Sequence, residues 1–158
     1  MKRVLFVCLG NICRSPAAEG IFKKLVERAG LADRIEIDSA GTSGYHDGEP
    51  ADARMIYHAK ERGYELTTLS RAFVAPDDFE KFDLILTMDQ SNFANVASLD
   101  KQLRYQHKVF PIVKFCQIHS VNEVPDPYYE GVEGFRVVLD ILEDACENLL
   151  VHVQKELT

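Results

Sequence analysis

The feature that most constrains the fold lies in the first thirty residues, where a strand pattern passes directly into a helix pattern. Residues 3–8 form an apolar run with two valines and a phenylalanine, which is typical of a strand buried on both faces. Ser15 then fits a helix N-cap and Pro16 the first helical position, with Glu19 in the first turn, and Gly30 fits the end of this helix. A buried strand that leads straight into a helix begins a β-α-β unit, so the chain is predicted to build a parallel sheet.

The same alternation continues along the chain. Further strands are predicted at residues 35–39, 82–88 and 109–113. Further helices are predicted at about 51–62, with Gly63 as the stop, after Asp89 and Ser91, and at 132–154. Strands that alternate with helices predict an α/β fold whose parallel sheet is covered on both faces. With 158 residues, 46% of them hydrophobic, the chain is expected to form one domain over residues 1–158.

Charge and hydropathy exclude several classes of protein. The chain has 25 acidic and 18 basic residues, a net charge of −7 and no long basic run, so we expect no binding of nucleic acid. The apolar run 4–8 is too short for a signal peptide, and no stretch is long enough to span a bilayer. We therefore expect a soluble, cytoplasmic protein without membrane insertion. In that compartment the four cysteines are expected to be reduced thiols: Cys8, Cys13, Cys116 and Cys146.

The segment between the first strand and the first helix is where we expect the chemistry. It lies at the carboxyl end of a strand, where open α/β sheets bind ligands. It also lies at a helix N-terminus, whose unpaired N–H groups and partial positive charge favour an anion. Gly10 and Asn11 enter positive φ readily, which suits a loop that turns its amides inward. We expect a phosphate group to be bound by the residues of this loop: Leu9, Gly10, Asn11, Ile12, Cys13 and Ser15.

Cys8, Arg14 and Ser15 add a nucleophile and a positive charge to this loop. The planar guanidinium of Arg14 can make bidentate hydrogen bonds to phosphate oxygens. The loop amides, Arg14 and the helix dipole are expected to lower the pKa of Cys8 and make it a thiolate near neutral pH. Ser15 can cap the helix or donate its hydroxyl to the sulfur. Each residue alone has a structural explanation, but the Cys-x5-Arg-Ser spacing between a buried strand and a helix predicts a cysteine nucleophile beneath a bound phosphate.

The reaction also needs an acid on the far side of the phosphate, to give the leaving oxygen a proton. Asp126 is the candidate, because Pro125 and Pro127 stiffen the backbone on both sides of it. An ordinary turn is the alternative interpretation of this Asp-Pro pair. Tyr128 and Tyr129 follow at once, and they either stack on an aromatic substrate ring or pack against the core as loop aromatics.

Segment 7–16 closely resembles the N-terminal signature of the low-molecular-weight protein tyrosine phosphatases. Segments that resemble the family follow in the family's order, so the resemblance covers nearly the whole chain: 38–42, 48–50, 82–83, 88–89 and 126–129. The resemblance implies a four-stranded parallel sheet with helices on both faces and no metal or other cofactor. It also implies two-step hydrolysis of phosphotyrosine in protein substrates, in which Cys8 carries the phosphate and Asp126 acts first as acid and then as base. Phosphate, the product, is expected to inhibit.

The resemblance suggests roles for further residues. Cys13 is expected to form a reversible disulfide with Cys8 that protects it from irreversible oxidation; packing as a small apolar residue is the alternative. Asn11 and Ser39 match positions whose side chains brace the phosphate loop, and each can equally be a turn residue. Asp89 matches a family acid at a strand end, but helix capping is the preferred interpretation.

Two positions depart from the common family pattern. Many family members have tryptophan where this chain has Tyr45, beside the expected site, so the substrate preference stays open. Thr68 stands where a histidine often belongs to the bracing network. The aromatic pair Tyr128 and Tyr129 is also expected to allow a weak homodimer that covers the site.

Two other functions use similar residues. A thioredoxin-linked arsenate reductase shares this fold and loop, but it relays oxidation through two further cysteines that are close together. Here Cys116 and Cys146 are 30 positions apart, and an Asp-Pro acid is present. A zinc or redox-sensing module would leave the phosphate-shaped loop without a purpose, although the spacing permits four ligands: Cys8, Cys13, Cys116 and His119.

Overall fold

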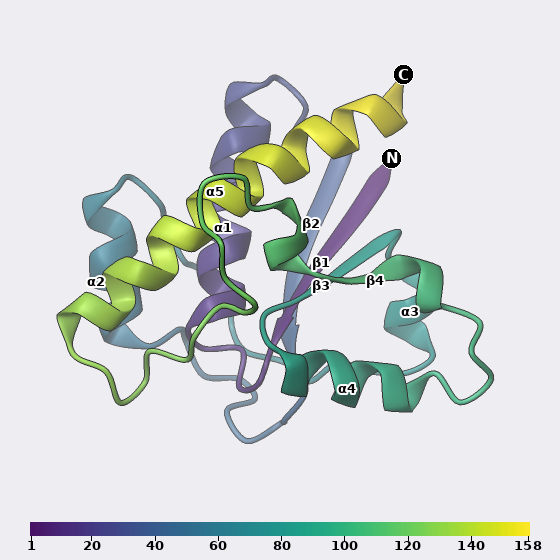
Figure 1. The fold of residues 1–158 in the computed structure, drawn as a ribbon, viewed down its shortest axis with the longest axis horizontal. Helices are drawn as coiled ribbons and strands as arrows, with labels where there is room; N and C mark the ends of the chain where they lie inside the picture. Colours follow the sequence, from purple (N-terminus) through teal and green to yellow (C-terminus); the bar gives the residue numbers. More distant parts are fainter.

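A four-stranded parallel sheet forms the centre of the molecule, as the sequence predicted. The structure is a computed structural model that describes residues 1–158. The strand order is β2-β1-β3-β4, and every neighbouring pair is parallel. The strands run over these residues (Figure 1): β1 Lys2–Cys8, β2 Ile35–Gly41, β3 Leu84–Thr87 and β4 Val109–Pro111.

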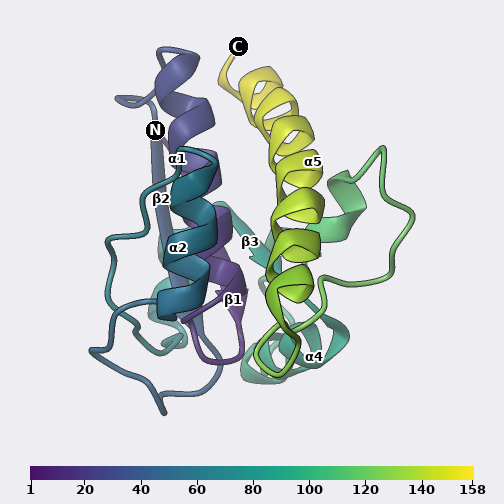
Figure 2. The ribbon, with the colours of Figure 1, turned by 90° about the vertical axis from the view of Figure 1, so that its left-hand side faces the viewer.

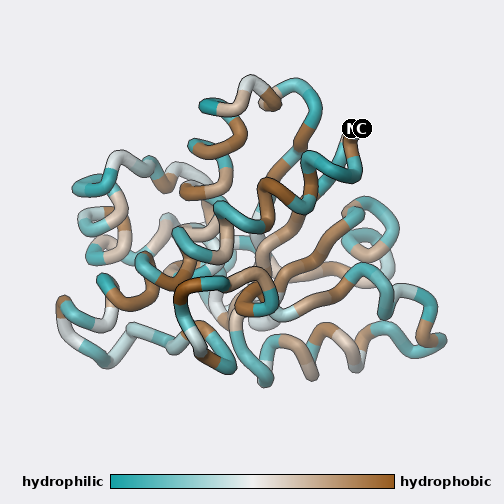
Figure 3. Tube along the Cα trace, turned by 45° about the horizontal axis from the view of Figure 1, so that its top comes forward, coloured by the Kyte–Doolittle hydropathy of each residue, from teal (hydrophilic) through white to brown (hydrophobic).

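Helices cover both faces of this sheet, because the side chains of β1 alternate between two apolar clusters. Val4 and Phe6 pack with α1, α2 and α5, whereas Leu5 and Val7 pack with α3 and α4. Figure 2 shows α1 and α5 side by side on the first of these faces. The helices run over these residues: α1 Arg14–Arg28, α2 Ala53–Glu61, α3 Asp77–Lys81, α4 Gln90–Leu99 and α5 Val132–Leu157. The strands are mainly hydrophobic and the outer turns hydrophilic (Figure 3), and no helix is both long and apolar enough to cross a membrane.

The strand order determines where a ligand can reach the sheet. After β1 the chain forms β2 on one side of β1 and then crosses to form β3 on the other side. Connections that leave β1 and β3 in opposite directions open a crevice at the carboxyl ends of these strands. The register places Cys8, the last residue of β1, opposite Gly41 at this edge.

The start of α1 differs from the prediction. The helix begins at Arg14, and Cys13 takes the N-cap position without a side-chain hydrogen bond. Ser15 is therefore inside the first turn and does not cap the helix, and Glu19 lies in the second turn. Its hydroxyl lies instead within bonding distance of Cys8 and Asn11, so of the two roles that the sequence allowed for Ser15 the contact with the sulfur is the one observed. Gly30 was predicted correctly as a stop, since it adopts φ 71° two residues beyond the helix end.

The other elements agree with the prediction in type but differ in length. The third strand is shorter than predicted, because Phe82 follows the short helix α3, which the pattern did not reveal. A helix of five residues is too short to show helical periodicity. The fourth strand ends at Pro111, and residues 112–115 form a turn of 3-10 helix. Asp89 caps α4 as predicted, with a reciprocal hydrogen bond between its backbone and Asn92.

Candidate active site

The loop from β1 to α1 has free amides and bonded carbonyls. No backbone N–H group of residues 9–14 donates a hydrogen bond within the protein. The loop carbonyls, in contrast, accept from the surrounding chain: Thr42 N–H to Cys8 O at 2.9 Å, Ser43 N–H to Leu9 O at 2.9 Å and Asp52 N–H to Ile12 O at 2.7 Å. A run of unpaired amides at a helix N-terminus is an anion-binding arrangement.

Two small residues allow this loop to form, each for a different reason. Asn11 adopts φ 57°, as the sequence predicted, while Gly10 does not have positive φ. At Gly10 a Cβ atom would lie 3.0 Å from the ring of His46, so a larger residue would require this ring to shift. At Gly41 on β2 glycine is needed for space, since a Cβ atom there would approach the backbone oxygen of Leu9 to 2.8 Å. The loop is therefore packed tightly between β2 and the segment that carries His46.

A network of buried hydrogen bonds supports the loop from behind. Cys8 Sγ lies 3.0 Å from Ser15 Oγ, and Asn11 Nδ2 donates to Ser15 Oγ at 2.8 Å and to Ser39 Oγ at 3.0 Å. Arg71 N–H donates to Asn11 Oδ1 at 3.0 Å, which determines the orientation of the amide. Because Ser15 Oγ accepts from Asn11, its own proton is free to point at the sulfur of Cys8, which is nearer than the other acceptor, Ala40 O, at 3.4 Å.

The network continues to a buried carboxylate that the sequence did not single out. Ser39 Oγ donates to Glu19 Oε1, and Thr68 Oγ1 donates to the same oxygen at 3.1 Å. Lys23 Nζ bonds to the other oxygen of Glu19 at 2.6 Å. The expected bracing role of Asn11 and Ser39 is thus matched by the geometry. Thr68, at the position where the resemblance suggested a histidine, reaches the network through its hydroxyl group. The i,i+4 spacing of Glu19 and Lys23 is the sequence signal that could have revealed this ion pair.

Arg14 is buried beside the loop with two of its nitrogens still free. Its side chain is 3% exposed, and Nη1 donates to Asp89 Oδ2 at 2.7 Å and to Val124 O at 3.0 Å. Burial lowers the pKa of Arg14, but the neighbouring Cys8, Asp89 and Asp126 outweigh it and raise the pKa above its usual value. Nε and Nη2 make no hydrogen bond within the protein and are the donors available to a ligand. Asp89 therefore both caps α4 and holds Arg14, and helix capping was only half of its role.

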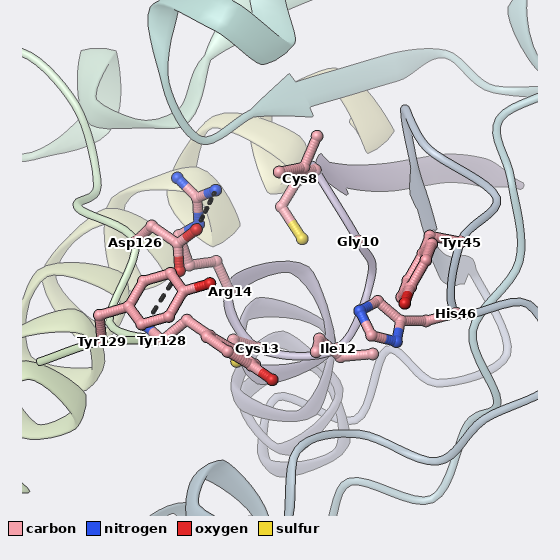
Figure 4. A pocket seen from close by; sticks show the side chains of 11 residues that line it. Cys8, Gly10, Ile12, Cys13, Arg14, Tyr45, His46, Asp126, Tyr128 and Tyr129 are labelled. Carbon is pink, nitrogen blue, oxygen red and sulfur yellow. Dashed lines mark hydrogen bonds and ion pairs between the residues drawn. The ribbon is translucent and has the colours of Figure 1, made fainter. Parts of the chain in front are cut away.

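Asp126 lies beside Arg14 and lines the same pocket as the loop. Its side chain is 49% exposed, and its Oδ2 atom lies 3.8 Å from Arg14 Nη2. Tyr128 N–H donates to Asp126 Oδ1 at 3.0 Å, so the carboxyl group turns back over its own loop. Figure 4 shows Asp126 and Arg14 on one side of the Cys8 sulfur and Tyr45 and His46 on the other.

These residues surround a pocket of about 400 Å³. It is lined by Cys8, Leu9, Gly10, Ile12, Cys13, Arg14, Tyr45, His46, Asp126, Tyr128 and Tyr129. All candidate residues of the sequence are here except Asn11, Ser15 and Ser39, whose side chains are buried behind the loop and cannot touch a ligand. His46 was missed, although it follows Tyr45; its Nδ1 pairs with Glu49. Tyr45 and Tyr129 are 85% and 93% exposed, so they form the rim of the pocket and do not pack against the core.

The other thiols have surroundings unlike that of a nucleophile. Burial raises the pKa of Cys13, and the neighbouring Asp52 and Cys8 add to the rise, so Cys13 stays protonated at neutral pH. Burial likewise raises the pKa of Cys146, which lies in the core between α5 and α1. The ligands of the alternative zinc site are not gathered, because His119 pairs with Asp144 on α5 at 3.1 Å while Cys13 lines the pocket.

Comparison with known proteins gives one consistent family. Residues 3–158 match the family model described as low molecular weight phosphotyrosine protein phosphatase. A putative low molecular weight protein-tyrosine-phosphatase of Synechocystis is 51% identical over 155 residues, which cover 98% of each chain. A protein tyrosine phosphatase from Entamoeba histolytica has a similar structure, with a TM-score of 0.94, 46% identity and full coverage of both chains. A Drosophila arginine phosphatase is similar at a TM-score of 0.88 and 33% identity, covering 97% of this chain and 98% of its own.

Proposed function

Because the chain belongs to the low molecular weight phosphotyrosine protein phosphatase family, we propose that it hydrolyses phosphotyrosine through a covalent phosphate on Cys8. The observation that carries this assignment is the run of unpaired amides at residues 9–14, which surrounds the Cys8 end of the pocket and is joined there by the free donors of Arg14. Amides and guanidinium together match the oxygens of a phosphate dianion.

In the first step, the Cys8 sulfur attacks phosphorus while the bond to the tyrosine oxygen breaks. The amides and Arg14 bind the equatorial oxygens and stabilise the charge that they carry in the transition state. Asp126, which lines the same pocket beside Arg14, gives its proton to the leaving phenolate. The products of this step are tyrosine and a phosphocysteine.

In the second step, water attacks the phosphocysteine and the sulfur leaves. Asp126, now a carboxylate, takes the proton of the attacking water, and inorganic phosphate is released. The hydroxyl of Ser15, which lies 3.0 Å from Cys8 Sγ and has its proton free for it, stabilises the departing thiolate. Phosphate fits the same donors and is therefore expected to inhibit as a product.

The walls of the pocket support an aryl phosphate as substrate. Tyr45 stands on one side and Tyr128 and Tyr129 on the other, so an aromatic ring above the phosphate would lie between aromatic side chains. A peptide with phosphotyrosine is expected to give a higher kcat/KM than the same peptide with phosphoarginine, the substrate class suggested by the Drosophila neighbour's name.

The experiment that tests the mechanism compares three proteins on para-nitrophenyl phosphate, with chelator and without added metal. The intact chain should turn over, and Cys8→Ser should be inactive. Asp126→Asn keeps an acceptor for Tyr128 N–H but has no acidic proton to give, so its rate of turnover should fall about a hundredfold. Intact-mass analysis after an acid quench should find one phosphate on Cys8. Activity in Cys8→Ser, or full activity in Asp126→Asn, would contradict the assigned roles.

The remaining properties follow from the same site. A cytoplasmic location is proposed because the reaction needs a free thiol at Cys8, and all four cysteines are unpaired. Under oxidation, a disulfide between Cys8 and Cys13 is proposed to protect the nucleophile. A weak homodimer is proposed through Tyr128 and Tyr129, and sedimentation of Tyr129→Ala against the intact chain would test it.

A further inference from the structure

The loop that carries Asp126 has few connections to the rest of the protein. Within residues 125–130 there are two hydrogen bonds, from Tyr128 N–H to Asp126 Oδ1 at 3.0 Å and from Glu130 N–H to Pro127 O at 2.9 Å. One hydrogen bond joins residues 125–130 to another part of the chain, from Arg54 Nη1 to Tyr128 O at 3.1 Å. The other polar link is the ion pair between Arg14 Nη2 and Asp126 Oδ2 at 3.8 Å, which is longer than a hydrogen bond. Arg54 therefore makes the single hydrogen bond that ties this loop to the rest of the protein.

Arg54 is itself held in place on several sides. Nη2 and Nε bond to the two oxygens of Asp52 at 2.9 Å and 3.1 Å. Its guanidinium lies 4.9 Å from the ring centre of Phe135, which belongs to the core, and 5.2 Å from that of Tyr128. A planar cation between two rings and a carboxylate has little freedom to move.

The turn that carries Arg54 also touches the phosphate loop. Asp52 is the N-cap of α2, and its backbone N–H donates to Ile12 O at 2.7 Å. One turn of the chain thus contacts the loop of the nucleophile through Asp52 and the loop of the acid through Arg54. This turn therefore links the loop that follows Cys8 to the loop that carries Asp126.

We propose that Arg54 is a positioning residue for the general acid. It holds the carbonyl of Tyr128, whose own N–H group orients the carboxyl group of Asp126. This inference rests on the proposed role of Asp126. It predicts that loss of Arg54 harms proton donation and leaves phosphate binding intact, because Arg54 contacts neither Arg14 nor the free loop amides.

The competing role for Arg54 is attraction of an acidic substrate, since its side chain is 49% exposed near the rim. The two roles differ in their dependence on the leaving group. A general acid matters most when the leaving oxygen is basic, as in phenyl phosphate, and least when it is strongly activated, as in 2,4-dinitrophenyl phosphate. Attraction of the substrate would act equally on both.

The test is a set of kcat/KM values for these two phosphates in Arg54→Gln and Arg54→Lys, alone and combined with Asp126→Asn. Arg62→Gln is the matched control, because Arg62 also joins α2 to α5, through Asp140 at 2.8 Å, but lies away from the pocket. Thermal unfolding of each variant checks that it is folded.

In Arg54→Gln, kcat/KM is expected to fall about tenfold with phenyl phosphate and less than about twofold with the activated ester. A tenfold fall is the effect of a modest misplacement of a catalytic group. Arg54→Lys should recover little, because an ammonium cannot reproduce the fork between Asp52 and Tyr128 O. In the Asp126→Asn background the loss should disappear, and Arg62→Gln should change neither value.

Four results would overturn the inference. Equal losses with both phosphates, or full recovery by Arg54→Lys, would assign Arg54 to attraction of the substrate. An unchanged loss in the Asp126→Asn background would show that Arg54 acts independently of the acid. If Asp126→Asn alone keeps full activity with phenyl phosphate, the proposed function of Asp126 fails together with this inference, whereas the other three results leave that function intact.

Discussion

The two loops that face each other across the pocket are held in opposite ways. The phosphate loop is packed against β2, and its side chains Asn11 and Ser15 are buried. Its carbonyls accept hydrogen bonds from three separate segments, which carry Thr42 and Ser43, Asp52, and Ser70. The loop of Asp126 is exposed and has one hydrogen bond to the rest of the chain over residues 125–130. Rigidity is therefore concentrated where charge must be stabilised, while the position of the loop beside the entrance depends on one hydrogen bond from Arg54.

The largest expected effect tests the rigid loop through Arg14. Arg14→Lys keeps a positive charge but loses the planar guanidinium group. In the intact chain one nitrogen of this group donates to Asp89 Oδ2 and Val124 O, while its other two nitrogens make no hydrogen bond and can bind a ligand. We expect kcat/KM for aryl phosphates to fall by about 10³-fold, the loss seen when a major transition-state donor is removed.

The control for this prediction is Lys24→Arg, which exchanges the two cations at a partly exposed position on the same helix. That variant should keep its activity within about twofold, because Lys24 belongs neither to the phosphate loop nor to its hydrogen-bond network. A mild loss in Arg14→Lys would mean that charge alone, without geometry, is sufficient in the phosphate loop.

The second prediction tests the support behind the same loop. Asn11→Ala removes the amide that bonds Ser15, Ser39 and the backbone of Arg71, and it puts alanine at φ 57°. We expect a loss of about 3 kcal/mol in the free energy of unfolding, from unpaired buried groups and backbone strain. Activity should fall by more than tenfold, because the Ser15 proton is no longer directed at Cys8.

Urea denaturation followed by fluorescence, with kcat measured on the folded protein, checks both effects. Asn148→Ala serves as the comparison, since it removes an amide bonded only to Asp144 on α5. If Asn11→Ala is as stable as Asn148→Ala, the phosphate loop does not depend on its buried network.

The third prediction concerns the segment that leads into the loop of Asp126. The carboxylate of Asp144 accepts from the backbone N–H groups of Gln117, Ile118 and His119. Burial raises the pKa of Asp144, but the hydrogen bonds outweigh burial and lower the pKa from 3.8 to about 2. A pKa that is lower in the folded than in the unfolded chain contributes stability that is fully present above the pKa of the unfolded chain. This stability is lost as the pH falls from about 4 through about 2. The contribution is about 2 kcal/mol.

Chemical denaturation between pH 2 and pH 6 measures this contribution. Asp144→Asn should be less stable than the intact chain at pH 6, and the difference should shrink as the pH falls toward 2. A constant difference across this range would show that the carboxylate charge is not what holds residues 117–119.

The smallest effect is expected at the rim. Tyr129 is 93% exposed, so Tyr129→Ala should change the free energy of unfolding by less than about 0.5 kcal/mol. Loss of one stacking surface should raise KM for a phosphotyrosine peptide by about threefold without changing kcat for a small alkyl phosphate. A change in kcat for both substrates would show that Tyr129 also affects the position of Asp126.

Local sequence determined the strand-loop-helix segment that binds phosphate. Cys8, Arg14 and the loop between them are contiguous, so hydropathy, glycine and helix start signals describe them without knowledge of distant residues. The four strands, the long α5 and the stop at Gly30 were predicted for the same reason, although element ends moved by a few residues. Asp126 was selected as the candidate acid because two prolines flank it and because segment 126–129 resembles the family, while its role stays a prediction.

The contacts between distant residues were decided by the tertiary structure alone. Asp89 turned out to hold Arg14, and Arg54 to hold the loop of Asp126. Each of these contacts depends on the register of β1 with its neighbours and on how the helices pack across the sheet. A residue pattern with a period of two or four positions describes which face is buried, but it carries no information on which polar group of another element comes within 3 Å of it.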